Sequence, residues 1–304
     1  MNPFTNRGMV TDPADFIGRR EQMEEICTRL DKMESTSIVG ERRIGKSSLL
    51  YQLALTGKER LERPAYRFFY IDLQDAHCHT ALGFFQTVLG KVGAATDAVK
   101  EGNSLNGNLI AFGDGIEALE RDGQRIVLCL DEFENAFKHP AEFGDDFFDH
   151  LRSLVNVRRL ALVTASRQTL QALSLAGKLT SPFYNLLTTI ELKEFNEAEA
   201  QEFIAAYHAR VQFTDAELQF LFSYLDPHPL KLRILCDWVF KNRQKRLAEW
   251  ALAEEITKEY GNFIVGKFDP KQFIRAKRVL SLDSINKLLD VIQKGRGLLK
   301  GSDK

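Results

Sequence analysis

Long apolar runs and internal repeats are absent from this 304-residue sequence. No apolar segment approaches the length of about 20 residues that a membrane-spanning helix needs. The first residues, MNPFTNRGMV, contain no apolar signal core, and no similarity recurs at a solenoid period. We therefore expect a globular, cytoplasmic protein with no membrane span.

Cysteine pairs and a strong overall charge are missing as well. Cys27, Cys78, Cys129 and Cys236 are scattered without disulfide or metal spacing, which is typical of reduced cytosolic thiols. The net charge of −1 does not mark a nucleic-acid-binding protein. Residues 267–304 nevertheless hold ten Lys or Arg and four Asp or Glu, a net of +6, so the rest of the chain carries −7.

A phosphate-binding motif is present in the stretch GERRIGKS, residues 40–47, which fits G-x-x-x-x-G-K-[ST] at every fixed position. We expect Gly40 to permit a sharp exit from a strand. Gly45 would let backbone N–H groups approach phosphate oxygens at a helix N-terminus. Lys46 would add a cation for the β- and γ-phosphates, and Ser47 a hydroxyl ligand for Mg²⁺. The motif predicts a nucleotide site.

Two acids follow a buried strand in RIVLCLDE, residues 125–132. We expect Asp131 to hold Mg²⁺ through water, at the end of a strand next to the strand of the phosphate-binding motif. Glu132 would orient and deprotonate the attacking water. Alone, the pair is as well explained by an ordinary acidic strand end. Together with the motif it favours nucleotide hydrolysis.

Arg167 ends another apolar run, LALVTASR. Ligands of open α/β sheets bind at the carboxyl ends of the strands, and a guanidinium matches phosphate geometry. We therefore expect Arg167 to contact the γ-phosphate, with a solvated arginine at a strand exit as the alternative.

Strand-like and helix-like segments alternate over the first two thirds of the chain. The continuous apolar character of the strands predicts an α/β fold, with a five-stranded parallel sheet covered by helices on both faces. The expected strands are 37–39, 66–73, 125–132, 159–167 and 186–195. The expected helices are 19–33, 46–55, 81–92, 109–119 and 143–155.

Strand signals cease at Asn196, and the segments that follow are helical in period. We therefore predict an α/β nucleotide-binding domain over 1–195 and an all-helical lid over 196–266. The remaining 267–304 reads as a basic amphipathic segment, which we expect to dock on protein rather than on lipid or nucleic acid. The alternative is a terminal helix packed on the lid.

Five stretches together resemble a STAND-type ATPase, a branch of the AAA+ P-loop superfamily. They are FIGRREQMEEI, GERRIGKSSLL, LCLDEFE, LVTASR and DPHPLKLRIL, and the resemblance spans residues 2–245. It implies that Phe16, Ile17, Gly18 and Arg19 contact adenine and ribose. It also implies that Arg43, Ile44 and Ser48 belong to the nucleotide-binding loop, and that Pro229 of the lid lies over the base. His228 stands before this proline, where the family has a glycine.

AAA+ relatives complete their site with an arginine from a neighbouring subunit, just before the fifth strand. Here that stretch is GKLTSPFYNLLTT, with Lys178 and no arginine. The departure favours slow hydrolysis and switch behaviour over motor work. Arg158 and Arg159 are alternatives for a contact in trans, and Lys231 and Arg233 are candidates for a lid-side phosphate sensor.

The resemblance implies an ATP-binding, slowly hydrolysing conformational switch that uses ATP or ADP and Mg²⁺. Its nucleotide state would control self-assembly, or binding of a separate sensor or effector protein. One alternative is a DNA-engaged AAA+ ATPase of the origin-recognition or transposition-helper kind. Another is a non-catalytic scaffold that bound nucleotide stabilises.

Overall fold

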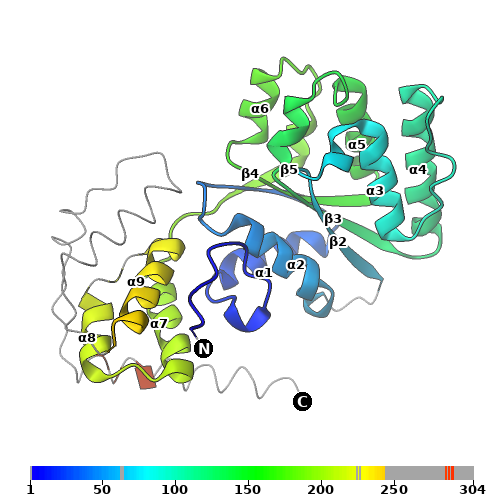
Figure 1. The fold of residues 1–304 in the computed structure, drawn as a ribbon. Coiled ribbons are helices and arrows are strands. Elements are labelled where there is room, and N and C mark those ends of the chain that lie inside the picture. Colours follow the sequence, from blue (N-terminus) through cyan, green and yellow to red (C-terminus); the bar gives the residue numbers. More distant parts are fainter. Residues whose placement is uncertain are drawn as a thin grey trace.

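A five-stranded, all-parallel sheet forms the centre of the larger part of the chain in the computed structural model. The structure describes residues 2–61, 65–223, 225, 227–243, 285, 287, 289 and 290. The strands are β1 (Ser35–Val39), β2 (Tyr66–Asp72), β3 (Arg125–Asp131), β4 (Leu160–Ser166) and β5 (Leu187–Glu191). Their order across the sheet is β2-β3-β4-β1-β5 (Figure 1). The sheet predicted from the sequence is confirmed.

Helices cover both faces of this sheet, because the buried strands are apolar on both sides. One face packs against α1 (Arg20–Leu30) and α2 (Lys46–Arg60). The opposite face packs against α3 (Ala81–Val92), α4 (Leu105–Arg121), α5 (Asp145–Asn156) and α6 (Leu170–Ala176) (Figure 1). Short 3-10 turns lie at Pro13–Asp15, Ala76–His79, Phe133–Lys138 and Phe183–Leu186.

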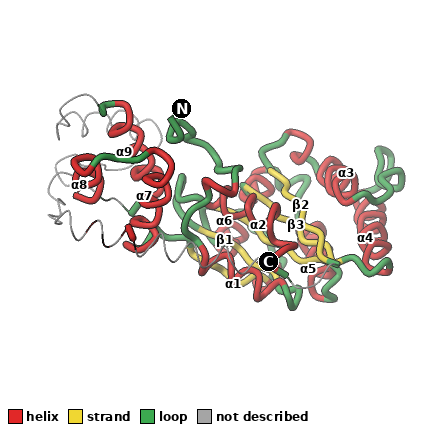
Figure 2. The backbone as a smooth tube through the Cα atoms, turned by 90° about the horizontal axis from the view of Figure 1, so that it is seen from below, coloured by secondary structure: helices red, strands yellow, loops and turns green. Residues whose placement is uncertain are grey.

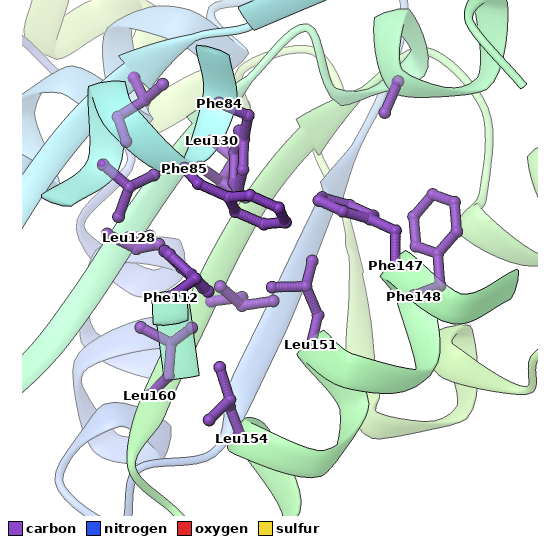
Figure 3. Packing of buried hydrophobic residues seen from close by; sticks show 14 of the residues in the cluster. Phe84, Phe85, Phe112, Leu128, Leu130, Phe147, Phe148, Leu151, Leu154 and Leu160 are labelled. Atoms are coloured by element: carbon purple, nitrogen blue, oxygen red, sulfur yellow. The ribbon is translucent and has the colours of Figure 1, made fainter. Parts of the chain in front are cut away.

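Phenylalanines fill the layer between the sheet and α3–α6. Phe84 and Phe85 of α3 meet Phe147 of α5, with ring centroids 5.4 and 5.7 Å away (Figure 3). Phe112 of α4 lies 4.8 Å from Phe85. Each of these rings is at most 1% exposed, so each contributes about 1.5–3 kcal/mol of burial energy. These phenylalanines therefore form part of the hydrophobic core on this face of the sheet.

Three helices form a second cluster beside the sheet (Figure 2). They are α7 (Glu197–Val211), α8 (Asp215–Ser223) and α9 (Pro229–Lys241). Asn196 and Glu199 form a capping box that starts α7 where the strand pattern ends. We call these helices the lid. Ile285 and Leu289 are buried in the same cluster. Apart from residues 285, 287, 289 and 290, the predicted basic segment lies outside the described part of the chain, as do residues 244–266.

The order of the strands corrects one expectation. Asp131 ends β3, which pairs with β2 and β4, whereas β1 pairs with β4 and β5. The acid pair is therefore separated from the strand of the phosphate-binding motif by β4, rather than lying on a neighbouring strand. Within the described residues, no helix is long and apolar enough to cross a membrane.

Candidate nucleotide-binding site

The phosphate-binding loop joins β1 to α2. Gly45 has φ +103° and directly precedes the first helical residue, Lys46. L-residues rarely adopt this conformation, so glycine is favoured at this position. The loop also holds Arg43 at φ 68°. The resulting turn places the free N–H groups of the α2 N-terminus at the loop, where they favour an anion.

Gly40 is required for a different reason from the one expected. Its φ lies outside the left-handed region, so the exit from β1 needs no special backbone conformation there. A Cβ at this position would lie 2.6 Å from the carbonyl oxygen of Leu192. The N–H of Leu192 donates to the carbonyl of Val39 at 2.6 Å, which brings the two segments together. Glycine permits this close approach.

Lys46 extends along the loop from the start of α2. Its Nζ donates to the carbonyls of Gly40 at 2.8 Å and Glu41 at 2.9 Å. Burial lowers the pKa of Lys46, while the charges of Glu132, Glu134 and Asp131 oppose that effect. The ammonium thus lies between the loop and the acids, where a phosphate could take over its hydrogen bonds.

The acid pair occupies the carboxyl end of β3. Asp131 Oδ2 accepts a hydrogen bond from the Tyr70 hydroxyl at 2.7 Å, and Oδ1 accepts one from the Glu132 N–H at 3.0 Å. Glu132 has φ 48°, an uncommon conformation for a residue other than glycine. Of the two acids, only Glu132 lines the cavity described below.

Arg167 lies beside the acid pair, one residue after β4. Its guanidinium is 3.8 Å from Glu132 and 3.4 Å from Glu134, and its side chain is 50% exposed. Burial, Glu134 and Asp131 raise the pKa of Glu132, against the opposing charges of Arg167 and Lys46. A carboxylate with a raised pKa is a stronger base, as the predicted role of Glu132 demands.

A cavity of about 330 Å³ joins the loop, the end of the sheet and the lid. That volume is at the lower end of the range for small-molecule sites. Seven basic and two acidic side chains line the cavity, which therefore suits a polyanion. They are Arg7, Arg19, Arg42, Arg43, Lys46, Arg167 and Arg233, with Asp15 and Glu132.

Most of the residues predicted for the site meet at this cavity. Those that line it are Phe16, Ile17, Arg19, Arg43, Ile44, Gly45, Lys46, Ser47, Ser48, Glu132, Arg167 and Pro229. Gly18, Gly40 and Asp131 do not line it. Gly40 permits the close approach of the loop to Leu192, and Asp131 accepts the N–H of Glu132. Gly18 has φ +77° and lies beside Phe195.

Arg19 connects the segment predicted to contact the base with two other parts of the site. Its guanidinium donates to the carbonyl of Ile44 in the loop at 3.0 Å and lies 4.6 Å from the ring centroid of Phe195. Its backbone N–H donates to Glu199 of the lid at 2.8 Å. Burial lowers the pKa of Arg19 to about 10, so it remains a cation at neutral pH.

The lid contributes Pro229 and Arg233. Pro229 is the first residue of α9, and His228 caps this helix by accepting the N–H of Leu230 at 3.2 Å. His228 has φ −76°, so the turn does not need the glycine of related proteins. Burial lowers its pKa to about 4, which leaves the imidazole neutral. Of the two predicted lid-side sensors, Arg233 lines the cavity and Lys231 does not.

The sequence reasoning missed the N-terminal arm, residues 2–11. Its residues Asn6 to Val10 line the cavity. The arm binds α2, because the Val10 N–H donates to Ser48 Oγ at 3.0 Å and Gln52 donates to the Val10 carbonyl at 3.1 Å. It also binds the lid, because Phe4 is fully buried in the lid cluster. No periodic pattern in the sequence indicated these contacts.

The arm is further fixed by a buried charge. Arg7 pairs with Asp237 of α9 at 2.5 Å, and Asn2 donates to the other oxygen of Asp237 at 2.6 Å. The carbonyl of Arg7 accepts from Arg43 of the loop at 2.9 Å. One segment thus contacts both the phosphate-binding loop and the lid.

The donor set also fits a magnesium ion. Mg²⁺ prefers oxygen ligands and usually keeps several waters, with one or two protein side chains and the phosphates of the nucleotide as its other ligands. The hydroxyl of Ser47 and the carboxylate of Asp131 supply such oxygens at the start of α2 and the end of β3. The chemistry of these residues therefore matches the ion that the sequence predicts.

Arg159, a candidate for a contact in trans, is engaged within its own chain. It pairs with Glu117 at 2.9 Å and with Glu120 at 3.1 Å, both on α4. These ion pairs account for a charged residue directly before β4.

Solved structures of P-loop ATPases share this fold. A Walker-type ATPase of Pyrococcus abyssi is 15% identical, with a TM-score of 0.58 over 96% of this chain and 93% of that one. The ORC2 protein of Aeropyrum pernix, in its ADPNP–ADP complexes, is 14% identical, with a TM-score of 0.54 over 95% and 70%. Domain III of the replication initiation protein DnaA of Thermotoga maritima is 14% identical, with a TM-score of 0.51 over 85% and 100%.

Sequence comparison gives the closer assignment. No curated protein matches the chain. The family model described as Novel STAND NTPase 2, however, matches residues 26–249, which include the phosphate-binding loop, the acid pair and the described lid helices. The resemblance drawn from the sequence motifs is confirmed. The chain belongs to the Novel STAND NTPase 2 family of P-loop NTPases.

Proposed function

We propose that this NTPase binds ATP, hydrolyses it slowly, and converts the change of nucleotide into a movement of the lid. The observation that carries this proposal is the composition of the cavity. Basic side chains from the loop, the sheet, the arm and the lid all converge on it, seven in number against two acids. A triphosphate bound there would contact every element that has to move.

The loop and the sheet supply the chemical groups. Lys46 and the N-terminus of α2 bind the phosphates, and Ser47 and Asp131 would hold Mg²⁺. When bound, the ion would neutralise charge that develops on the phosphoryl oxygens. Glu132 accepts a proton from the attacking water, and Arg167 contacts the γ-phosphate. Phe16, Ile17, Arg19 and Pro229 enclose the base.

Two arginines at the cavity, Arg167 and Arg233, would couple the nucleotide state to the position of the lid. Its guanidinium lies next to both Glu132 and Glu134. A γ-phosphate would compete with these carboxylates for it, so ATP and ADP would leave Arg167 in different positions. Arg233 presents a second guanidinium from the lid side of the same cavity. If the lid makes strong contacts with only one of the two nucleotides, its angle differs between the ATP state and the ADP state.

Assembly is the output that we propose. The stretch before β5 contains Lys178 and no arginine, whereas AAA+ relatives carry an arginine in that stretch, so turnover would be slow. Slow turnover suits a switch that persists in its ATP state. In that state the chain would associate with itself or with a separate sensor or effector protein.

Phosphate release is the test of this activity. With Mg²⁺ and ATP we expect slow turnover, well below the median enzyme rate of about 10 s⁻¹. Chelation of Mg²⁺ should abolish it. Turnover that is absent while ADP still binds would support the non-catalytic scaffold instead. Stimulation of ATP turnover by DNA would support the DNA-engaged ATPase instead. The ORC2 and DnaA structures share the fold of this chain.

A further inference from the structure

Tyr70 of β2 is a polar residue at the site to which no role has been assigned. Its hydroxyl donates to Asp131 Oδ2 at 2.7 Å across the β2–β3 pair. The other oxygen of Asp131 accepts the Glu132 N–H at 3.0 Å, and Asp131 is only 3% exposed. Both carboxylate oxygens thus have a fixed donor, and the carboxylate cannot rotate without breaking a hydrogen bond.

The phenol can act only as a donor in this contact. Burial raises the pKa of Tyr70, and the negative charge of Asp131 raises it further. The raised pKa keeps the hydroxyl protonated at neutral pH. A protonated phenol that faces an ionised carboxylate donates a charge-assisted hydrogen bond, which is stronger than a neutral one.

The ring of Tyr70 is itself held by the helix of the phosphate-binding loop. Tyr51 of α2 meets it edge to face, with ring centroids 5.4 Å apart and an interplanar angle of 73°. Tyr51 comes four residues after Ser47 and therefore lies on the same side of α2. The aromatic pair thus connects the helix that carries Ser47 to the strand end that carries Asp131.

We propose that Tyr70 is a positioning residue for magnesium. Its hydrogen bond orients Asp131, and its contact with Tyr51 sets Asp131 relative to Ser47. This inference rests on the proposed function, in which Ser47 and Asp131 hold the ion. Groups that orient the ligands of a metal typically change its affinity about 10–100-fold when they are removed.

Tyr66 provides a matched control on the same strand. It lies four residues before Tyr70 and so points to the same face of the sheet. Its hydroxyl donates to the carbonyl of Leu30 at 2.6 Å, and the side chain is fully buried. Tyr66→Phe removes a hydroxyl from the same strand face without touching the acid pair.

The test compares wild type, Tyr70→Phe and Tyr66→Phe in binding of a fluorescent ATP analogue as Mg²⁺ is titrated. We expect Tyr70→Phe to raise the Mg²⁺ concentration at half effect about 10-fold. Affinity for the nucleotide in EDTA should stay at the wild-type value. Tyr66→Phe should lower the melting temperature and leave the Mg²⁺ midpoint unchanged. Tyr51→Leu, which keeps the Tyr70 hydroxyl, should shift the midpoint in the same direction as Tyr70→Phe.

The possible results distinguish a failure of this inference from a failure of the proposed function. Equal Mg²⁺ midpoints for wild type and Tyr70→Phe would overturn the inference, as would equal shifts in Tyr70→Phe and Tyr66→Phe. If Tyr70→Phe does not fold, Tyr51→Leu decides, and an unshifted midpoint there overturns the inference. If Mg²⁺ has no effect on wild type, the proposed function fails instead.

Discussion

Replacing Lys46 by alanine is expected to abolish nucleotide binding. The Lys46 ammonium is the cation that donates to two loop carbonyls at the start of α2, where the phosphates would lie. The variant loses charge-assisted hydrogen bonds of about 1.5–3 kcal/mol each, so affinity should fall by about 100-fold or more. Calorimetric titration with ATP and with ADP measures this loss.

Lys58→Ala is the control for that experiment. Lys58 belongs to the same helix and is exposed, so its removal changes the charge of α2 without changing the loop. It should bind nucleotide as wild type does. Retained affinity in Lys46→Ala, with an intact fold, would show that the loop is not the phosphate site.

Replacing Glu132 by glutamine is expected to stop hydrolysis while ATP stays bound. The amide has the shape of the carboxyl group but cannot accept the proton of the attacking water. Loss of a general base costs about 10²–10⁴-fold in rate. Single-turnover phosphate release measures the step, and the variant should accumulate in the ATP state and the assembled form. Equal turnover in wild type and Glu132→Gln would refute the role of Glu132.

The pH dependence gives a second readout of the same residue. Burial raises the pKa of Glu132, and the base works only when it is ionised. Turnover should therefore fall as pH drops through this raised pKa, at a higher pH than for an ordinary glutamate. The residual rate of Glu132→Gln should lack that limb, whereas Glu59→Gln, at an exposed position of α2, should keep it.

Local signals in the sequence predicted the elements well. The strands were placed to within a few residues because buried parallel strands form continuous apolar runs between polar loops. The helix predicted at 81–92 is α3 with the same bounds. Helix α4 starts earlier than the expected residue 109, at Leu105, because the Ser104 side chain caps it by accepting the N–H of Gly107. The short α6 was not predicted.

Contacts between distant segments could not be predicted in this way. Strand order is set by packing over the whole domain, so the sequence did not indicate that β4 separates Asp131 from β1. The N-terminal arm lacks periodicity, and its place at the cavity depends on partners such as Ser48, Gln52 and Asp237. The hydrogen bond of Tyr70 to Asp131 likewise joins two strands that are distant in the chain.

We expect the nucleotide state to move the lid. The N-terminal arm contacts Ser48 of α2 near one end, and its Phe4 packs in the lid cluster near the other. A shift of the phosphate-binding loop would therefore reach α9 in two ways: through the N-terminal arm, and through the nucleotide bound in the cavity.

Small-angle X-ray scattering of Glu132→Gln with ATP, with ADP and without nucleotide, alongside melting temperature, tests this claim most directly. Both nucleotides should raise the melting temperature, and the ATP and ADP forms should differ in radius of gyration or particle mass. Lys46→Ala should show none of these changes. Identical scattering and melting under all three conditions would contradict the account.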